Sequence, residues 1–155
     1  MAQLGVPVSG SDRAESANLQ SLRQAGVRVS VPQDAVNIHD VDTVVISTAI
    51  HEDNPELAKA RELGLPILHR SEALAAVMGD SQVVAVAGTH GKSTTSSMIS
   101  VMFDGLNAKP SFAVGTVIAG RGTNAHLGAQ GPESIFVAEA DESDGSFVRY
   151  RPAIA

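Results

Sequence analysis

The sequence predicts an α/β fold in which parallel strands alternate with helices. Short apolar runs alternate along the chain with amphipathic segments that end at glycine, and this β-α-β-α order is typical of parallel sheets with right-handed crossovers. The apolar runs consist of Val, Ala, Leu and Ile, and only 3% of residues are aromatic. Such strands suit a sheet that is buried on both faces. A length of 155 residues leaves room for one domain or for parts of two.

The first half of the chain contains four expected strands and three expected helices. The strands lie at residues 5–9, 27–31, 42–48 and 66–69. The helices lie at residues 13–26, 54–64 and 71–79. Ser11 or Asp12 is the expected N-cap of the first helix, because hydroxyl and carboxylate oxygens accept bonds from the first free N–H groups. Asn54 and Ser71 are the expected N-caps of the second and third helices, and Pro55 suits the first helical position of the second.

The second half of the chain begins with a longer apolar strand and a glycine turn. The expected strands are residues 83–87, 110–115 and 134–138. A helix is expected at residues 95–106, where the sequence is "TSSMISVMFDGL". Residues 119–133 form a glycine-rich loop, and a loop of that length between elements is usually functional.

The stretch "GTHGKST" at residues 88–94 directly follows the strand "VVAVA". A phosphate-binding loop has the form G-x-x-x-x-G-K-[ST], and Gly91, Lys92 and Ser93 fit its last three positions. Val86 occupies the position of the first glycine, so the pattern fails as written, but the physical arrangement of strand, glycine turn, lysine, hydroxyl and helix is complete. The alternative is a tight turn with a surface lysine. We disfavour it because this combination is uncommon directly after a buried strand.

In such a loop the backbone N–H groups and the start of the following helix surround the phosphates of a nucleotide. The lysine reaches the β and γ phosphates, and the hydroxyl binds Mg²⁺. The sequence therefore predicts a nucleotide site formed by Gly88, Thr89, His90, Gly91, Lys92, Ser93 and Thr94.

A cluster of carboxylates follows the last apolar strand. Glu139, Asp141, Glu142 and Asp144 lie within six positions, and their mutual repulsion would be relieved by a divalent cation or by N–H donors. The alternative is a solvated acidic turn. In P-loop proteins a carboxylate at the end of a neighbouring strand holds Mg²⁺, which favours the metal interpretation. Glu139 comes first after the strand, so we expect Ser93 and Glu139 to be the metal ligands.

These motifs divide the chain near residues 79–81. Residues 1–79 are expected to form a partial Rossmann-like domain, and residues 80–155 are expected to form the first part of a P-loop ATP-binding domain.

Composition excludes several classes of protein. The net charge of −6 and the pI of about 5.2 disfavour a binder of nucleic acid or of anionic membranes, which needs excess Lys and Arg. The first residues lack the basic start and apolar core of a signal peptide, and no apolar run is long enough to span a bilayer. The chain contains no cysteine, which excludes disulfides and thiolate metal sites. We therefore expect a cytoplasmic protein without nucleic-acid or membrane partners.

The phosphate loop, together with "NAHLG" (124–128) and "EADESDGSF" (139–147), resembles the Mur ligases of peptidoglycan synthesis. That family's loop has the form T-G-T-x-G-K-T, which lacks the early glycine and accounts for Val86. Three earlier segments resemble the family's N-terminal domain, and the resemblance covers essentially the whole chain. These segments are "VSGSD" (8–12), "VVISTAIHEDNPEL" (44–57) and "PILHRSEAL" (66–74).

The resemblance implies an ATP-dependent ligase that activates a carboxylate as an acyl phosphate. The motifs are most similar to those of members that add the first amino acid of the stem peptide, so the implied substrates are UDP-N-acetylmuramate and L-alanine, with ATP and Mg²⁺ as cofactors. Lys92 would neutralise the transferring phosphoryl group, and Ser93 and Glu139 would hold Mg²⁺. Residues 1–79 would bind the UDP-sugar.

The resemblance also suggests contacts to the UDP-sugar. The candidates are Ser11, Asp12, Ser47, His69, Arg70, Asn124 and His126. Ser11 and Asp12 follow the first strand, where Rossmann folds place groups that touch a nucleotide, but they suit a helix N-cap equally well. His69 and Arg70 could meet an anionic substrate or only cap the next helix. His90 could contact the reacting carboxylate or be solvated.

The chain departs from the family pattern in several ways. Ser93 replaces the commoner threonine and keeps the hydroxyl, and Thr116 stands where a second glycine is usual. In the family a strand and a glycine-rich phosphate loop precede the segment that matches the start of this chain, and further domains follow its end. We therefore expect a fragment that does not catalyse ligation by itself.

Four alternatives remain. A sister ligase that recycles a tripeptide shares the phosphate loop, although "ESDGSF" favours the alanine-adding enzyme. Folylpolyglutamate synthase shares the loop and the reaction type but not the N-terminal segments. The chain could be a non-catalytic nucleotide-binding module. An NAD(P)-binding reductase would explain only the Rossmann-like half, and it leaves Lys92 and Glu139 unexplained.

Overall fold

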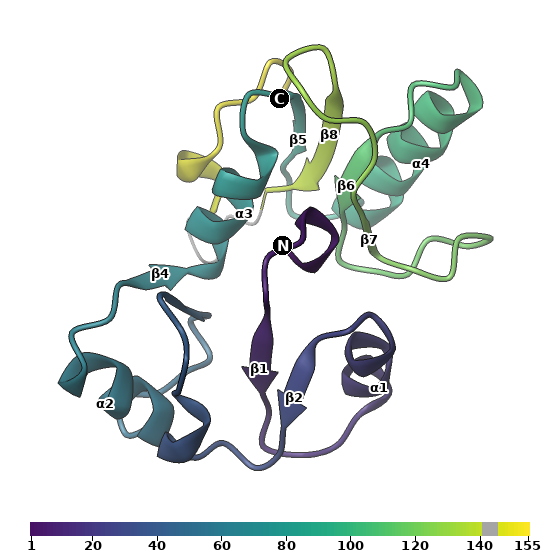
Figure 1. Ribbon diagram of the computed structural model, residues 1–155. Helices are drawn as coiled ribbons and strands as arrows, with labels where there is room; N and C mark the ends of the chain where they lie inside the picture. Colours follow the sequence, from purple (N-terminus) through teal and green to yellow (C-terminus); the bar gives the residue numbers. More distant parts are fainter. Residues whose placement is uncertain (141–145) are drawn as a thin grey trace. The chain divides into compact units, whose positions relative to one another are not determined.

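The computed structural model describes residues 1–140 and 146–155, and the chain divides into two compact units, Met1–Arg70 and Ser71–Ala155 (Figure 1). Both units alternate strands with helices, and most of the strand pairs are parallel. The predicted α/β class with parallel strands is therefore confirmed. Within the described ranges, no helix has the length and apolar character that crossing a membrane requires.

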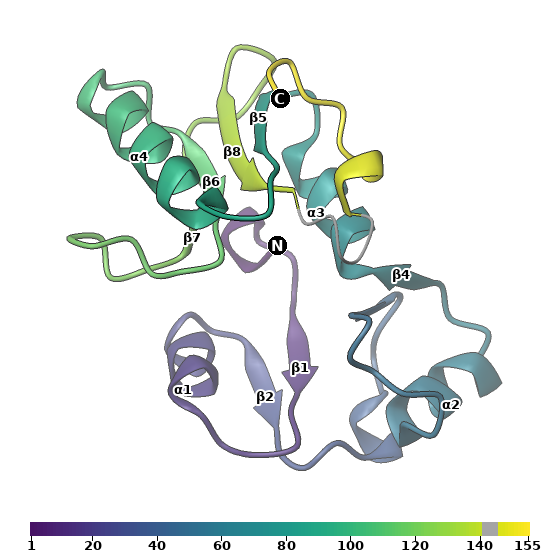
Figure 2. The same ribbon diagram turned by 180° about the vertical axis from the view of Figure 1, so that it is seen from behind.

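The first unit contains two separate two-stranded parallel sheets, β1–β2 and β3–β4, which Figure 2 shows from behind. Its strands are β1 (Ser9–Ser11), β2 (Arg28–Ser30), β3 (Val44–Ile46) and β4 (Ile67–His69). Its helices are α1 (Ala17–Gln24) and α2 (Pro55–Glu62), with 3₁₀ turns at Ala2–Leu4 and Ala35–Asn37. The strand expected at residues 5–9 is thus shifted toward the C-terminus. Pro7 has no backbone N–H to donate to a strand ladder, and pairing with β2 begins in the register Ser9 to Arg28.

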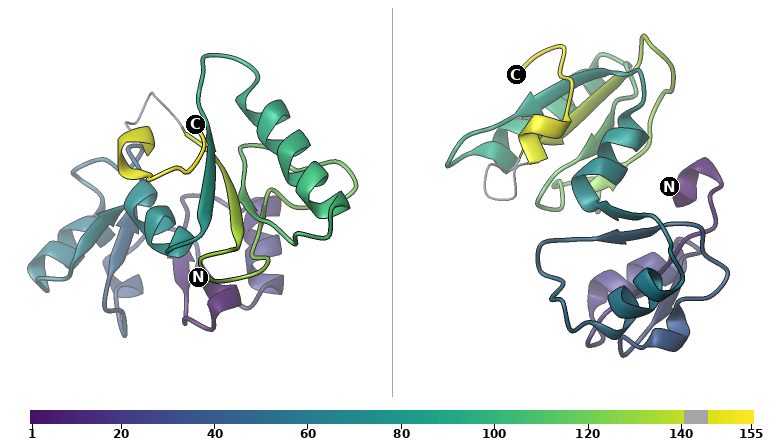
Figure 3. Two further views of the ribbon diagram at one scale, coloured as in Figure 1. Left: turned by 90° about the horizontal axis from the view of Figure 1, so that it is seen from above. Right: turned by 90° about the vertical axis from the view of Figure 1, so that its left-hand side faces the viewer.

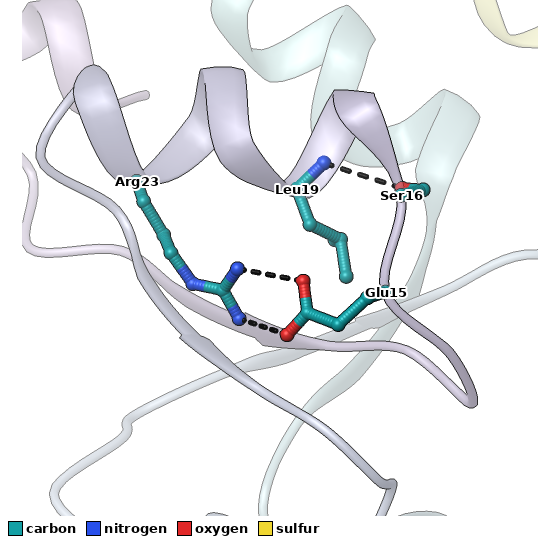
Figure 4. Close-up of polar contacts among 4 residues, drawn as sticks. All are labelled: Glu15, Ser16, Leu19 and Arg23. Atoms are coloured by element: carbon teal, nitrogen blue, oxygen red, sulfur yellow. Dashed lines mark hydrogen bonds and ion pairs between the residues drawn. The ribbon is translucent and has the colours of Figure 1, made fainter.

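Helix α1 begins later than expected. Ser16 is its N-cap, and the Ser16 hydroxyl accepts a bond of 3.3 Å from the Leu19 backbone N–H (Figure 4). The prediction of Ser11 or Asp12 as the cap was therefore wrong. Glu15, just before the cap, accepts two hydrogen bonds of 2.7 and 2.8 Å from Arg23, and this contact lowers the pKa of the Glu15 carboxyl.

Helix α2 has the predicted start. The Asn54 side-chain oxygen accepts bonds of 2.9 Å from Glu56 N–H and 3.0 Å from Leu57 N–H, and Pro55 occupies the first helical position. Asn54 is itself buried, and its amide group donates to the Gln33 side chain at 3.0 Å. Both ends of this side chain are therefore hydrogen-bonded.

The second unit is built on a four-stranded sheet in the order β5-β8-β6-β7. The strands are β5 (Gln82–Val86), β6 (Ser111–Ala113), β7 (Ala125–His126) and β8 (Ile135–Glu139). The helices are α3 (Arg70–Met78) and α4 (Lys92–Gly105), with a 3₁₀ turn at Ser146–Arg149. β5, β8 and β6 are parallel to one another, and β7 is antiparallel to β6. The sequence did not predict β7, which lies inside the glycine-rich loop.

Two apolar clusters cover opposite faces of this sheet. Phe136 and Ala138 of β8 belong to the cluster beneath α3, whereas Val137 belongs to the cluster beneath α4. This alternation is the two-residue period of a strand. Figure 3 shows α3 and α4 on either side of β5 and β8. The sheet is therefore buried on both faces, as its apolar strands predicted.

The unit division falls after Arg70, whereas the expected domain boundary lies at residue 79. The difference is helix α3, because Leu74, Ala75 and Met78 pack with the apolar cluster of the second unit. Ser71 was expected to cap this helix, and that prediction was wrong. The helix follows β4 without a loop and begins at Arg70, so Ser71 lies in its first turn and is only 1% exposed.

The end of the glycine-rich loop is held against the start of β6. Gly128 N–H donates to the Ser111 hydroxyl at 2.9 Å, and Ala129 N–H donates to the Lys109 carbonyl at 2.8 Å. A Cβ atom on Gly128 would lie 2.0 Å from the Lys109 carbonyl oxygen. Only glycine permits this approach of two backbone segments.

Gly128→Ala should therefore destabilise the second unit by about 2 kcal/mol or more, because backbone rather than a flexible side chain must move. The matched control is Gly105→Ala, whose Cβ would meet no atom within 4 Å. Because Gly105 lies in helix α4, that variant should leave stability unchanged or raise it by up to about 1 kcal/mol. Chemical denaturation followed by the fluorescence of Tyr150, which is buried in this unit and is the chain's one tyrosine, measures both. Equal stabilities for the two variants would contradict the argument.

Candidate phosphate and metal site

The carboxyl ends of three parallel strands meet at one edge of the second unit's sheet. Val86 at the end of β5 pairs with Glu139 at the end of β8, and Ala113 at the end of β6 pairs with Ala138. Ala140 N–H also donates to the Val86 carbonyl at 3.0 Å, which extends the ladder beyond Glu139. The phosphate loop that follows β5 and the carboxylate that ends β8 therefore start from neighbouring points.

The phosphate loop turns through two glycines with positive φ. Gly88 has φ of 132° and Gly91 has φ of 81°, which L side chains rarely adopt. Gly91 is the N-cap of α4, and its carbonyl accepts the first helical bond from Thr95 N–H at 2.9 Å. The glycine pattern in the sequence is thus explained by backbone conformation. The turn leaves a hollow of about 320 Å³ lined by Thr89, His90, Gly91, Lys92, Ser93 and Thr94.

Lys92 is the first residue of α4, and its side chain turns back over the loop. The Lys92 ammonium donates to the Gly88 carbonyl at 2.6 Å. The positive charge therefore lies at the loop that leads into the start of helix α4. An anion in the hollow would receive both the ammonium charge and the favourable end of the helix dipole.

Ser93 and Glu139, the two predicted metal ligands, face a common space beside Gly115. The Glu139 Oε1 atom accepts a bond of 2.7 Å from Gly115 N–H. A Cβ atom on Gly115 would lie 3.0 Å from Glu139 Oε2 and 3.3 Å from Ser93 Oγ. The structure thus brings together a hydroxyl and a carboxylate, which are the hard oxygen donors that Mg²⁺ prefers.

Among the described residues, Glu139 is the acidic side chain that lies beside Gly115 and Ser93. Across residues 1–140 and 146–155, no three His, Asp or Glu side chains gather as a metal-binding group. Asp141, Glu142 and Asp144, the other carboxylates of the predicted cluster, lie outside the described residues.

The residues of the first unit that are predicted to contact a sugar nucleotide lie near strand ends. Their hydrogen bonds differ from one residue to the next. The Ser11 hydroxyl donates to Glu56 Oε2 at 2.5 Å, and Asp12 accepts from Arg13 N–H at 2.6 Å. Ser47 follows β3, and its hydroxyl is 3.4 Å from Ala49 N–H. His69 ends β4 and is half-buried, and Arg70 begins α3 and is exposed. These five residues lie at or just after the ends of strands in two separate sheets, so their joint role remains a prediction.

Glu56 is a residue that the sequence analysis missed. Besides the Ser11 hydroxyl, its carboxylate accepts bonds from the Asn37 amide at 2.7 Å and from Asp34 N–H at 3.3 Å. It thus joins β1, the 3₁₀ turn Ala35–Asn37 and helix α2. In the sequence, Glu56 stands out only by its place in the first turn of a helix. Acidic residues are common there because the helix dipole favours them, so this position did not indicate the contacts with Ser11 and Asn37.

Asn124 and His126 lie on the glycine-rich loop of the second unit, and both are exposed. The Asn124 carbonyl accepts from Val114 N–H at 2.9 Å, and the His126 ring centroid lies 5.8 Å from that of Phe112. These contacts hold the loop against β6. A contact of either side chain with a sugar remains a prediction.

The sequence profile described as "Mur ligase family, catalytic domain" matches residues 1–82. The UDP-N-acetylmuramate–L-alanine ligase of Paenarthrobacter aurescens is 56% identical over all of this chain, which corresponds to 33% of that relative's length. The enzyme of the same name from Renibacterium salmoninarum is 57% identical, with the same two shares. The chain therefore spans about a third of the length of these curated relatives.

Solved structures of two related ligases resemble this chain. UDP-N-acetylmuramate:L-alanyl-gamma-D-glutamyl-meso-diaminopimelate ligase from Neisseria meningitides matches with a TM-score of 0.89 and 30% identity, covering 99% of this chain and 53% of that one. UDP-N-acetylmuramate-alanine ligase from Thermotoga maritima matches with a TM-score of 0.86 and 30% identity, covering 97% of this chain and 35% of that one.

Lys92→Ala should weaken binding of tripolyphosphate to this chain by about tenfold or more, because a hydrogen bond to a charged group is lost with the charge. Lys59→Ala is the matched control, since it removes the same charge from helix α2, where Lys59 pairs with Glu62. Isothermal titration calorimetry measures both variants. A similar loss of tripolyphosphate affinity in both variants would mean that net charge alone causes the effect, and it would contradict a specific site.

Proposed function

Because the chain belongs to the Mur ligase family, we propose that it forms part of an ATP-dependent ligase that joins L-alanine to UDP-N-acetylmuramate in peptidoglycan synthesis. The observation that carries the proposal is the phosphate loop beside Glu139 at one sheet edge. The choice of substrates is supported by the names of the curated relatives, which are 49 to 57% identical.

In the proposed reaction the lactyl carboxylate attacks the γ phosphorus of ATP, and ADP leaves. The amine of L-alanine then attacks the acyl carbon of the acyl phosphate, phosphate leaves, and the nitrogen loses a proton. Negative charge gathers on the phosphoryl oxygens in the first step, so the contribution of this chain is positioning and electrostatic stabilisation. The loop N–H groups and Lys92 would hold those oxygens.

Ser93 and Glu139 are the residues that would hold Mg²⁺, and their oxygen donors fit that ion. Bound there, the ion would supply neutralisation of charge on the phosphates. His90 lines the loop hollow and is exposed, so it is available to the reacting carboxylate.

A ligase that joins a tripeptide to the same nucleotide sugar is the second candidate, because the solved structure of UDP-N-acetylmuramate:L-alanyl-gamma-D-glutamyl-meso-diaminopimelate ligase matches this chain with a TM-score of 0.89. The alanine-adding structure from Thermotoga maritima matches with the same identity of 30%, so the preference for L-alanine is supported by the curated relatives at 49 to 57% identity. The two functions differ only in the amine substrate, so a single assay separates them.

The proposed function is tested by replacing the matching third of the Paenarthrobacter aurescens ligase with this chain. The chimaera should form UDP-N-acetylmuramoyl-L-alanine from ATP, Mg²⁺ and the two substrates, as detected by mass spectrometry. Lys92→Ala in the chimaera should slow the reaction by about a hundredfold or more, since a preorganised charge at the phosphoryl group is lost. A folded chimaera that uses only the tripeptide, or that is unaffected by Lys92→Ala, would overturn the proposal. The 155-residue chain alone should give no product.

Glu139→Gln in the same chimaera should raise the Mg²⁺ concentration needed for half-maximal rate by about tenfold or more, because it keeps the size of the side chain and removes its charge. Asp141→Asn is the matched control, since it removes one charge from the same cluster. If Asp141→Asn shifts the Mg²⁺ dependence and Glu139→Gln does not, the metal carboxylate has been assigned to the wrong residue.

A further inference from the structure

We propose that Gly115 is a positioning residue for the Mg²⁺ site, and that it acts through Glu139. Its backbone N–H would orient the Glu139 carboxylate, and its lack of a side chain would keep open the space shared by Glu139 and Ser93. This inference rests on the proposed function, because it presumes that these two residues hold Mg²⁺ for ATP.

The two carboxylate oxygens of Glu139 have different surroundings. Gly115 N–H donates to Glu139 Oε1 at 2.7 Å. Glu139 Oε2 is the atom nearest to the position of a Cβ on Gly115, at 3.0 Å, and Ser93 Oγ follows at 3.3 Å. One oxygen is therefore held by the backbone, while the other borders the same space as the serine hydroxyl.

Glycine is required at residue 115 for space rather than for backbone conformation. Gly88 and Gly91 have positive φ, whereas Gly115 does not. A Cβ on Gly91 would meet no atom within 4 Å, whereas a methyl group on Gly115 would touch both oxygens assigned to the metal. An alanine at residue 115 is thus compatible with the local backbone and acts mainly on Glu139 and Ser93.

The Gly115 N–H is held in place from both sides along the chain. Val114 before it is buried, and its N–H donates to the Asn124 carbonyl at 2.9 Å. Ile118 after it is buried, and its N–H donates to the Thr123 carbonyl at 3.0 Å. A donor fixed in this way can select one orientation of the carboxylate, as partners of metal ligands commonly do.

The test measures binding of a fluorescent ATP analogue to the 155-residue chain, titrated with Mg²⁺ and repeated in EDTA. Gly115→Ala keeps the backbone N–H but places a methyl group against Glu139 Oε2 and Ser93 Oγ, so it should displace the carboxylate and raise the Mg²⁺ concentration for half-maximal binding by about tenfold or more. Binding in EDTA should stay within about twofold, because the phosphate loop is unchanged. A merely structural defect would weaken both. Gly105→Ala is the matched control and should change neither.

The pairing of Gly115 with Glu139 is tested by a double variant. Gly115→Ala should have a smaller effect in the Glu139→Gln background than in the unmodified chain, because both changes act on one carboxylate. Additive effects, or a Mg²⁺ dependence of Gly115→Ala equal to that of the unmodified chain, would overturn the positioning role alone. If Glu139→Gln leaves the Mg²⁺ dependence unchanged, the proposed metal site fails and this inference fails with it.

A measurement on the unmodified chain covers the case in which Gly115→Ala does not fold. The backbone amide resonance of Gly115 in a ¹⁵N-labelled sample should shift as Mg²⁺ is added with ATP, with the same midpoint as nucleotide binding. The resonance of Gly105 should not move. A Gly115 amide resonance that does not shift with Mg²⁺ while the nucleotide binds would overturn the proposal.

Discussion

The parallel pairing of β5 with β8 is the constraint on which the site depends. Its register sets Val86 opposite Glu139, so the strand that leads into the phosphate loop ends beside the strand that ends in a carboxylate. Burial on both faces fixes this register, because Val137 and Ala138 are 0% exposed and a slip by one residue would exchange their faces. Pairing of β6 with β8 then brings Gly115 to the same edge.

Glycine serves two physical purposes around this edge, and sequence distinguishes them poorly. Gly88 and Gly91 supply backbone angles that the loop needs. Gly115 and Gly128 have ordinary φ values, but each lies where a Cβ would meet another group, a carboxylate and a hydroxyl in one case and a backbone carbonyl in the other. The first kind forms part of a loop pattern that can be recognised, whereas the second depends on residues distant in the chain.

The sequence predicted the parts of the fold that local signals specify. The Asn54–Pro55 start of α2 and the buried strand before the phosphate loop were correct, because capping chemistry and apolar runs act over a few residues. The predicted cap of α1 was wrong because Ser11, Asp12 and Ser16 all precede this helix and all can accept a bond from its N–H groups. The Ser11 hydroxyl is instead bonded to Glu56, which lies 45 positions away. The short strand β7 was missed for a similar reason, since its two residues are ordered by pairing with β6.

The candidate site shows the same division between local and distant information. Lys92 and Ser93 were predicted from their spacing alone, and the strand end selected Glu139 from four carboxylates. What sequence could not supply is the contact that gives Glu139 a defined direction, because Gly115 N–H lies 24 positions away and carries no side chain to mark it. Acidic residues are common at strand ends. A fixed backbone donor on one carboxylate oxygen orients the other oxygen, as supporting partners of metal ligands commonly do. The arrangement of Ser93, Glu139 and Gly115 at the ends of the strands therefore arises from three segments together, and none of them carries it alone.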